Sequence, residues 1–201
     1  MATEQAPPAG VTGQLQFYTV PEPLSRDAHG GLAVQQLERP FAFAEHGHVV
    51  PLTVAEFGFA AVSYPIIFGG TAYMPLAVMG INGGENMFVK DGSYTVGAYV
   101  PAYTRRFPFV LASDDAQSRL VVCIERNAQI FCDKSKEGSV PLFTPAGEPS
   151  EYTANAIKFC EDFETERRRT EAFVTVLKDL DLFHTREAIY QQPNPDGTFT
   201  P

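Results

Sequence analysis

The residues best suited to bind a ligand are concentrated in the stretch GAYVPAYTRRFPF. An arginine guanidinium can stack on a tyrosine ring and still pair with a carboxylate through two hydrogen bonds. Tyr99, Tyr103 and Arg105 alternate with smaller or apolar residues, so an extended chain would place all three on one face. Pro101 and Pro108 disfavour a central strand, because proline cannot donate to a sheet. We therefore expect an extended segment at a sheet edge or cleft wall that contacts an acidic protein partner or a small acidic ligand.

A glycine-rich turn precedes this stretch, and two of its residues belong to the candidate site. Glu85 could bind a ligand or pair internally with Arg105, and Asn86 follows it directly. The turn lacks the Lys and Ser/Thr of a phosphate-binding loop and the full dinucleotide fingerprint, so we expect no cofactor. The predicted binding residues are Tyr99, Tyr103, Arg105, Arg106, Glu85 and Asn86. The alternative is ordinary sheet packing, with the arginines covering the surface.

Histidines and carboxylates gather in two short segments, Asp27-x-His29 and Glu45-His46-x-His48. On a strand, His46 and His48 would point to the same side. With Asp27 or His29 nearby they could form a metal site of two histidines and one carboxylate. The spacing is unspecific, and we favour a polar loop that leads into a helix, with no metal bound. A metal-dependent enzyme at these residues is the alternative to a non-catalytic binding protein.

Composition restricts the classes of function. The chain has 201 residues, 44% of them hydrophobic, and a formal net charge of −9, which fits one domain with a substantial core. Nucleic acid is not an expected partner, because phosphate binding needs a basic surface. No segment reaches the roughly 20 apolar residues that span a bilayer, and MATEQAPPAG is not a signal peptide. We expect a soluble cytoplasmic protein without membrane insertion, with signal-less export to the cell surface as a second location.

The three cysteines, Cys123, Cys132 and Cys160, have no metal-binding spacing. We expect free, buried thiols in a reducing compartment, and a Cys123–Cys132 bridge is the alternative in an oxidising one. Cys123 lies in an apolar run, which raises the pKa of a thiol and makes it unreactive. Ser25 and Ser63 lack the G-x-S-x-G context of a hydrolase nucleophile. The sequence therefore does not favour a serine or cysteine hydrolase.

Local signals predict how these residues are positioned. Asp91-Gly92 lies between two short runs of mixed apolar and polar residues, Asn86–Val89 and Tyr94–Val96, which is a strong hairpin signal. Thr53 and Glu56 have the spacing of a capping box, and Pro65 ends the helix that follows. Further strands are expected at Leu15–Val20, Leu32–Leu37, Pro65–Phe68, Tyr73–Gly80, Phe109–Ala112, Leu120–Glu125, Gln129–Cys132 and Pro141–Thr144, with Pro75 at an edge or bulge.

An amphipathic helix, or two helices in line, is expected near the C-terminus, from about Ser150 to Leu180, because apolar residues recur there at steps of three and four. The predicted class is α+β, with a curved, mostly antiparallel sheet, one short helix near residues 53–63 and a helical C-terminal segment packed on the core. The expected organisation is a disordered tail at residues 1–13, a β-rich core at 14–148 and the helical segment at 149–201.

The order of several motifs resembles the SapC family of bacterial proteins. They are FYTVPEPLSRDAHGGL, FAFAEHGHVVPLTVAEFGFAAVSYPIIF, GINGGENMFV, GAYVPAYTRRFPFVL and PLFTPAGEPSEYTANAIKFCEDFETERRRTEAF. The resemblance extends from about Phe17 to Phe173. It implies a non-catalytic binding or accessory protein that is associated with a bacterial surface layer or with a modification pathway. Members of the family continue beyond the last residue of this chain, so we expect the helical segment to be cut short.

Overall fold

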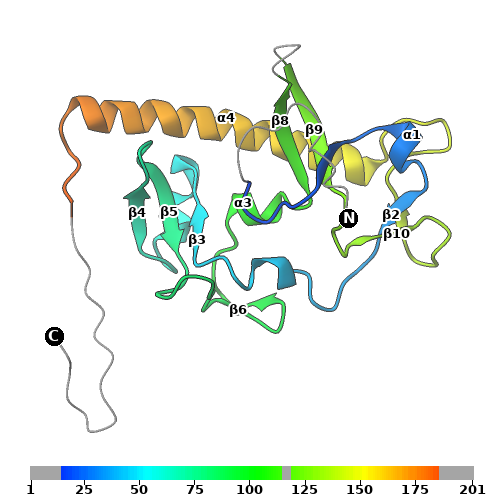
Figure 1. The fold of residues 1–201 in the computed structure, drawn as a ribbon, viewed down its shortest axis with the longest axis horizontal. Coiled ribbons are helices and arrows are strands. Elements are labelled where there is room, and N and C mark those ends of the chain that lie inside the picture. The colour runs from blue at the N-terminus through cyan, green and yellow to red at the C-terminus, as the bar shows by residue number, and fades with distance from the viewer. Residues whose placement is uncertain (1–14, 115–118, 186–201) are drawn as a thin grey trace, which may run out of the picture.

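The computed structural model describes residues 15–114 and 119–185, and the tail expected at 1–13 lies outside them. The fold is α+β, as predicted. Short strands and short helices alternate irregularly along the chain, and one long helix follows them (Figure 1). In chain order the elements are β1 Pro21–Pro23, α1 Arg26–His29, β2 Leu32–Val34, the 3-10 helix η1 Ala42–Ala44, β3 Val49–Pro51, the 3-10 helix η2 Val54–Glu56, α2 Phe57–Ala60, β4 Ile66–Gly69, β5 Met74–Val78, β6 Val89–Lys90, β7 Ser93–Tyr94, α3 Ala102–Arg105, β8 Phe109–Asp114, β9 Arg119–Glu125, β10 Phe131–Asp133, β11 Val140–Pro141 and α4 Glu151–Asp179.

The strands are antiparallel, as expected, but within the described residues they form several small sheets rather than one curved sheet. The orders are β1-β9-β8, β10-β2-β11, β3-β5-β4 and the hairpin β6-β7. Each strand is short, from two to seven residues. Prolines and glycines lie between many of the strands, and none of the strands in the described residues is long enough to pair across the whole molecule.

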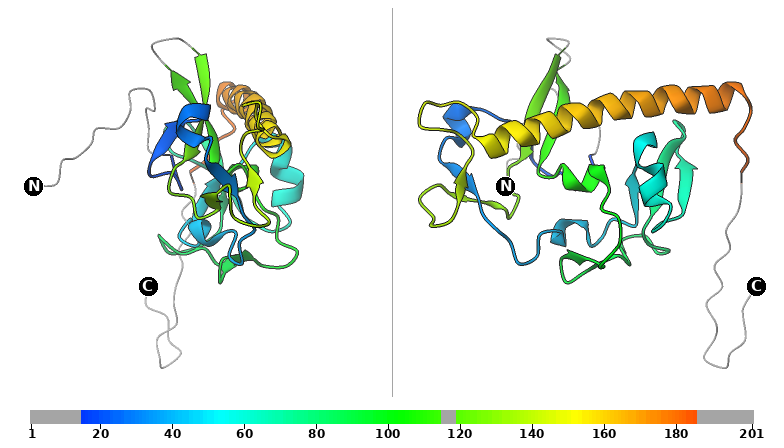
Figure 2. Two further views of the ribbon diagram at one scale, coloured as in Figure 1. Left: turned by 90° about the vertical axis from the view of Figure 1, so that its right-hand side faces the viewer. Right: turned by 180° about the vertical axis from the view of Figure 1, so that it is seen from behind.

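The helix α4 connects these small sheets. It begins at the cap residue Ser150, whose hydroxyl accepts a hydrogen bond from the Thr153 amide, and it runs for 29 residues, or about 44 Å. The left view of Figure 2 shows it nearly end-on, with the sheets beside it. Cys160 belongs to a core cluster with Phe109, Ile124 and Leu142, whereas Phe163, one turn later, belongs to a second cluster around β3 and β5. The helix predicted from Ser150 to Leu180 is confirmed, and it is the element that both clusters share.

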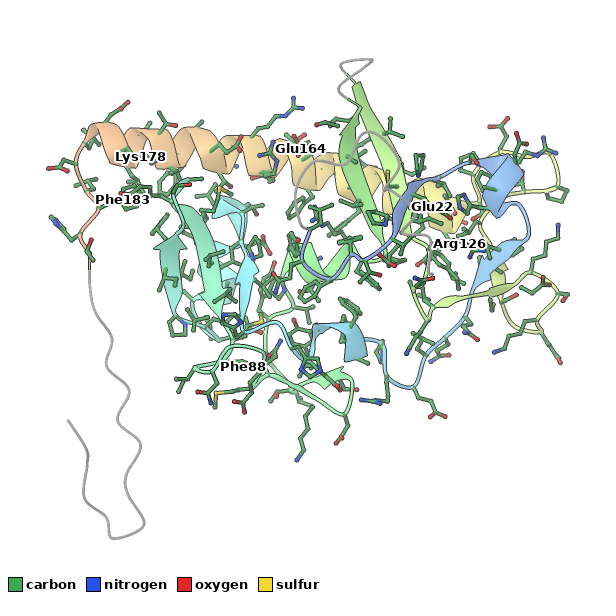
Figure 3. All side chains as sticks on the ribbon, in the orientation of Figure 1. Glu22, Phe88, Arg126, Glu164, Lys178 and Phe183 are labelled. Carbon is green, nitrogen blue, oxygen red and sulfur yellow. The ribbon has the colours of Figure 1, made fainter. Side chains whose placement is uncertain are left out.

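The last turn of α4 is fastened to the sheet β3-β5-β4. The Lys178 ammonium lies 4.7 Å from the centre of the Tyr73 ring. Phe183, just beyond the helix, contacts both Tyr73 and Phe68, at ring-centre distances of 4.7 and 5.1 Å (Figure 3). These contacts hold the C-terminal end of the helix against the strands that it covers. Within the described residues, no helix is both long enough and apolar enough to cross a membrane.

Two strand predictions fail at prolines. The strand expected at Leu15–Val20 lies instead at Pro21–Pro23, where β1 pairs with β9. On either side of β1, the Leu24 amide donates to the Val122 carbonyl of β9 and the Val20 carbonyl accepts from the Arg126 amide just beyond β9, so the intervening prolines face away from the ladder. Pro75 lies in β5, the central strand of its sheet, not at an edge or bulge. Pro75 has no amide hydrogen to donate, but the position that would accept it lies just beyond the end of β3. The Pro75 carbonyl still accepts from the Leu52 amide at 2.9 Å.

The predicted hairpin is confirmed as β6-β7. Asp91 and Gly92 form its turn with φ angles of 51° and 72°, the left-handed region that such a turn requires. A side chain on Gly92 would meet Arg39 at 2.4 Å, so only glycine fits there. The Gly92 amide donates to the Glu45 carboxylate at 2.7 Å, which fastens the hairpin to the segment before β3.

The helix predicted to follow Thr53 is also confirmed, as η2 and then α2, with a turn that continues to Ser63. Glu56 reaches back to the Thr53 amide at 2.8 Å, as the capping-box spacing predicts. The buried Glu56 carboxylate also accepts from the Ala102 amide at 2.7 Å and from the Tyr99 hydroxyl at 3.1 Å. One carboxylate therefore holds the starts of two helical segments, η2 and α3, that are far apart in the sequence.

This arrangement predicts that Glu56 matters more than the cap residue itself. Glu56→Ala should lower the free energy of unfolding by about 3 kcal/mol or more, because it leaves several buried donors without an acceptor. Thr53→Ala should cost about 1 kcal/mol, the usual value for a lost cap. Urea denaturation would measure both, with Glu161→Ala, an exposed glutamate on α4, as the control. Equal losses for Glu56→Ala and Glu161→Ala would contradict the role of the shared carboxylate.

All three cysteines are free thiols. Burial raises the pKa of Cys160 to about 11 and also raises that of Cys123, whereas Cys132 is only half-buried. Because the thiolate is the reactive form, we expect one fast-reacting thiol per folded chain when a disulfide reagent is added at pH 8, and three after unfolding in guanidinium. Cys132→Ser should remove the fast phase. A fast phase that persists in Cys132→Ser would show that a buried cysteine is exposed by local opening.

Candidate functional site

The stretch predicted to be extended is helical at its centre, so this part of the prediction is wrong. Pro101 precedes α3 and its carbonyl accepts from the amides of Thr104 and Arg105. A proline suits this position because the first amides of a helix lack partners within the helix. The Ala102 amide finds its partner in Glu56. Residues two apart in a helix point to different sides, so Tyr103 and Arg105 separate instead of sharing one face.

Arg105 lies on the outside of α3. Its side chain is exposed, its Nε donates to the Val100 carbonyl at 3.0 Å and its Nη2 donates to the Tyr99 hydroxyl at 3.3 Å. The guanidinium carbon lies 5.9 Å from the Tyr99 ring centre and 5.2 Å from that of Phe159 on α4. An aromatic pair therefore holds this arginine, as predicted, but Phe159 takes the place expected for Tyr103. The guanidinium remains accessible to solvent.

Arg106 lies on the inside. Its side chain is only 9% exposed, and its guanidinium carbon is 4.1 Å from the Tyr103 ring centre and 4.7 Å from that of Phe163. Tyr103 is buried as well, and its hydroxyl donates to the Gln16 carbonyl. Burial raises the pKa of Tyr103, against the opposing positive charge of Arg106. The four residues of the predicted surface thus form an outer pair, Tyr99 with Arg105, and an inner pair, Tyr103 with Arg106.

The two residues of the glycine-rich turn do not reach these pairs. Glu85 is exposed, and its carboxylate accepts from the Asn82 amide nitrogen at 3.1 Å rather than from Arg105. Asn86 is buried: its Nδ2 donates to the Ala44 carbonyl at 3.0 Å and its Oδ1 accepts from the Phe88 amide. Asn86 therefore organises the chain before β6, and its polar groups are already used within the fold.

The predicted histidine and carboxylate residues are also dispersed. His29 is buried, with Nε2 2.7 Å from Glu22, which in turn is 3.2 Å from Arg126 (Figure 3). His46 is exposed, and its Nδ1 lies 3.0 Å from the Gly84 carbonyl oxygen. In residues 15–114 and 119–185, no group of three or more His, Cys, Asp or Glu side chains could hold a metal ion. The four residues proposed for metal binding, His46, His48, Asp27 and His29, do not form one site there.

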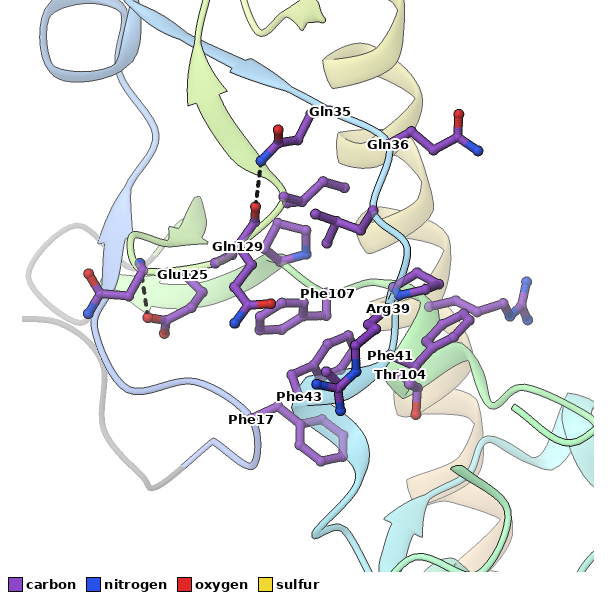
Figure 4. A pocket seen from close by; sticks show the side chains of 18 of the residues that line it. Phe17, Gln35, Gln36, Arg39, Phe41, Phe43, Thr104, Phe107, Glu125 and Gln129 are labelled. Carbon is purple, nitrogen blue, oxygen red and sulfur yellow. Dashed lines mark hydrogen bonds between the residues drawn. The ribbon is translucent and has the colours of Figure 1, made fainter. Parts of the chain in front are cut away.

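A large pocket that the sequence analysis did not identify lies beside α3. It has a volume of about 670 Å³, and four phenylalanines from separate parts of the chain line it: Phe17, Phe41, Phe43 and Phe107. We call it the Phe pocket (Figure 4). The Phe43 and Phe107 rings stack with their centres 3.9 Å apart, and Phe17 meets Phe43 edge to face at 5.3 Å. The run FAF at residues 41–43 was the only local signal, and it does not reveal which rings meet it.

Polar groups lie around the phenylalanines. Gln35 and Gln129 both line the pocket, and Gln35 Nε2 donates to the main-chain carbonyl of Gln129 at 3.0 Å (Figure 4). The lining also includes Thr104 and Arg105 from the predicted stretch. Glu125 is buried and already accepts hydrogen bonds from the Thr19 amide at 2.6 Å, the Val20 amide at 2.9 Å and the Thr19 hydroxyl at 2.9 Å. The exposed Gln129 side chain is therefore freer than Glu125 to meet a bound molecule.

Comparison with known proteins gives one result. A family model described as SapC matches residues 24–199. The chain belongs to the SapC family. Neither the search of curated proteins nor the search of solved structures found a match. The SapC match covers every element from α1 to α4, including α3 and most of the Phe pocket lining.

In this SapC-family chain, the outer and inner pairs predict different effects of mutation. Tyr103→Ala should lower the free energy of unfolding by about 3–5 kcal/mol, because it removes a buried ring from the core. Arg105→Ala should leave the melting temperature nearly unchanged, since its side chain is exposed and its contacts are made at the surface. Thermal and urea denaturation would measure both variants. If Arg105→Ala unfolds the protein as readily as Tyr103→Ala, the division into an outer and an inner pair is wrong.

Proposed function

We propose that this chain is a non-catalytic binding protein, and that the Phe pocket holds a small, planar and largely apolar molecule. The observation that carries the proposal is the pocket itself, about 670 Å³ in volume and walled by Phe17, Phe41, Phe43 and Phe107. This volume is within the range of ligand sites, which are typically apolar cavities with a few polar groups that fix orientation. Four rings offer faces and edges against which a flat molecule can stack.

The polar groups of the pocket suit orientation rather than chemistry. The described lining contains no histidine or cysteine, the residues that most often act as acid, base or nucleophile. Glu125, its one carboxylate, is already bonded to Thr19 and Val20. Of the two lining arginines, Arg39 is paired with Glu45 at 2.8 Å, and Arg105 donates to the Val100 carbonyl and the Tyr99 hydroxyl. The exposed Gln129 side chain can offer both a donor and an acceptor to a ligand edge, whereas the Gln35 amide is already bonded to Gln129 and to Lys136.

The finer part of the proposal comes from the family. The SapC resemblance implies an accessory role at a bacterial surface layer or in a modification pathway. A binding protein without a catalytic group of its own suits such a role, because it would hold or deliver a molecule that another protein uses. On this proposal the ligand of the Phe pocket is a flat intermediate or building block of that pathway.

The proposal predicts that a planar aromatic probe binds at Phe107. We expect 2-naphthol to show saturable binding to the purified chain in ligand-observed NMR. Phe107→Leu should weaken this binding at least tenfold, because it removes the ring that stacks on Phe43. Gln129→Ala should weaken it less, since the amide is on the exposed rim.

Phe59→Leu is the matched control, because Phe59 is 67% exposed on α2 and does not line the pocket. It should bind 2-naphthol like the unmodified chain. Melting temperatures of all variants would separate loss of binding from loss of fold. Equal affinity in the Phe107→Leu and Phe59→Leu variants, both folded, would exclude the Phe pocket as the binding site.

A further inference from the structure

A second cavity lies on the other side of α3, around the buried Arg106. Its volume is about 410 Å³, and the segment from β3 to η2, the hairpin β8–β9 and the middle of α4 enclose it. Tyr103, Arg106 and Phe163 line it on the inside. It shares no lining residue with the Phe pocket. Binding at one therefore can be tested independently of binding at the other.

The charges around this cavity do not balance. Its described lining carries two arginines, Arg106 and Arg167, and one carboxylate, Glu164. Glu164 is already committed, since it pairs with Arg167 at 2.7 Å and with Arg168 at 2.9 Å, and these contacts hold the pKa of its carboxyl below the usual range. No carboxylate of the described residues pairs with Arg106. The lining of this cavity therefore carries an excess of positive charge, whereas the chain as a whole has a formal net charge of −9.

The free-energy cost of burying the Arg106 charge is offset only in part. Its side chain is 9% exposed and its Nε has no hydrogen-bond partner among the described residues. Arginine stays charged in proteins, so it cannot escape this cost by losing its proton. The rings of Tyr103, Phe163 and Tyr18 offset part of it, since their centres lie 4.1, 4.7 and 5.7 Å from the guanidinium carbon. Such contacts are weaker than pairing with a carboxylate, which neutralises the charge of a buried arginine and accepts its hydrogen bonds.

We propose that the cavity binds a monocarboxylate with an apolar tail, and that the carboxylate pairs with Arg106. The rings cover the guanidinium from its faces, and a carboxylate approaches in its plane, so stacking and pairing are compatible. One uncompensated positive charge matches a single negative one. A doubly charged phosphate would leave excess charge in a largely apolar space, where burial of charge is costly.

The walls away from Arg106 suit the tail of such a molecule. They are formed mainly by aliphatic side chains, namely Leu52, Met74, Leu111, Leu120 and Leu15. Leu120 is 39% exposed and Ser113 beside it is exposed, so the cavity meets solvent at the hairpin β8–β9. A ligand would therefore place its carboxylate inside, at Arg106, and its tail along the aliphatic wall toward this opening.

The test uses octanoate as the probe, with octanol and octylamine as controls of equal length. Octanoate should bind the unmodified chain in isothermal titration calorimetry and raise its melting temperature, and neither control should do so. Arg106→Met should reduce octanoate affinity at least tenfold. Without ligand it should melt no lower than the unmodified chain, because it removes a buried charge while keeping a long apolar side chain. Arg169→Met, an exposed arginine on α4, should bind octanoate normally.

A readout on the unmodified chain covers the case in which Arg106→Met fails to fold. Octanoate labelled with ¹³C at its carboxyl carbon should titrate at a lower pH when bound than when free, because a guanidinium favours the charged form. Equal binding of octanol, unchanged affinity in a folded Arg106→Met variant, or a bound carboxyl that titrates like the free acid would each overturn the proposal. So would the absence of octanoate binding. None of these results bears on 2-naphthol and the Phe pocket.

Discussion

The carboxylate of Glu56 is the contact on which the arrangement of the candidate sites depends. It is buried between two segments, and it accepts hydrogen bonds from Thr53 at the start of η2 and from Tyr99 and Ala102 at the start of α3. A buried acceptor with so many donors cannot be moved without leaving amides unpaired. The position of α3 is thereby fixed, and with it the directions of Arg105 and Arg106, which face different cavities.

A second buried glutamate has the same role elsewhere in the fold. Glu125, at the end of β9, accepts from the amides of Thr19 and Val20 and so holds the chain before β1 against the β9–β10 connection. Thr170 of α4 extends the pattern, since its hydroxyl accepts from the Val54 amide at the start of η2. Side-chain acceptors of this kind replace the long ladders that small sheets lack, because every buried amide needs a partner.

This construction also accounts for where cavities form. Short strands joined by irregular segments leave spaces that a single continuous sheet would fill, and α4 bridges them without closing them. The Phe pocket lies between the segment before η1 and the start of β8, and the Arg106 cavity lies between the hairpin β8–β9 and α4. Membership of the SapC family assigns the whole arrangement to a family. The two proposals, a flat apolar ligand and an amphiphilic carboxylate, follow from the linings of these cavities.

The sequence alone determined the features that depend on neighbours within about four residues. The Asp91-Gly92 turn, the Glu56 cap of η2 and the long helix from Glu151 to Asp179 are of this kind, and all three are present. Tertiary structure decided the rest. The helical conformation of α3 depends on an acceptor 46 residues away, and Pro75 is tolerated in a central strand only because β3 ends beside it. The Phe pocket brings together Phe17, Phe43 and Phe107. No local sequence pattern predicts that these rings meet, because their contact results from packing between distant segments.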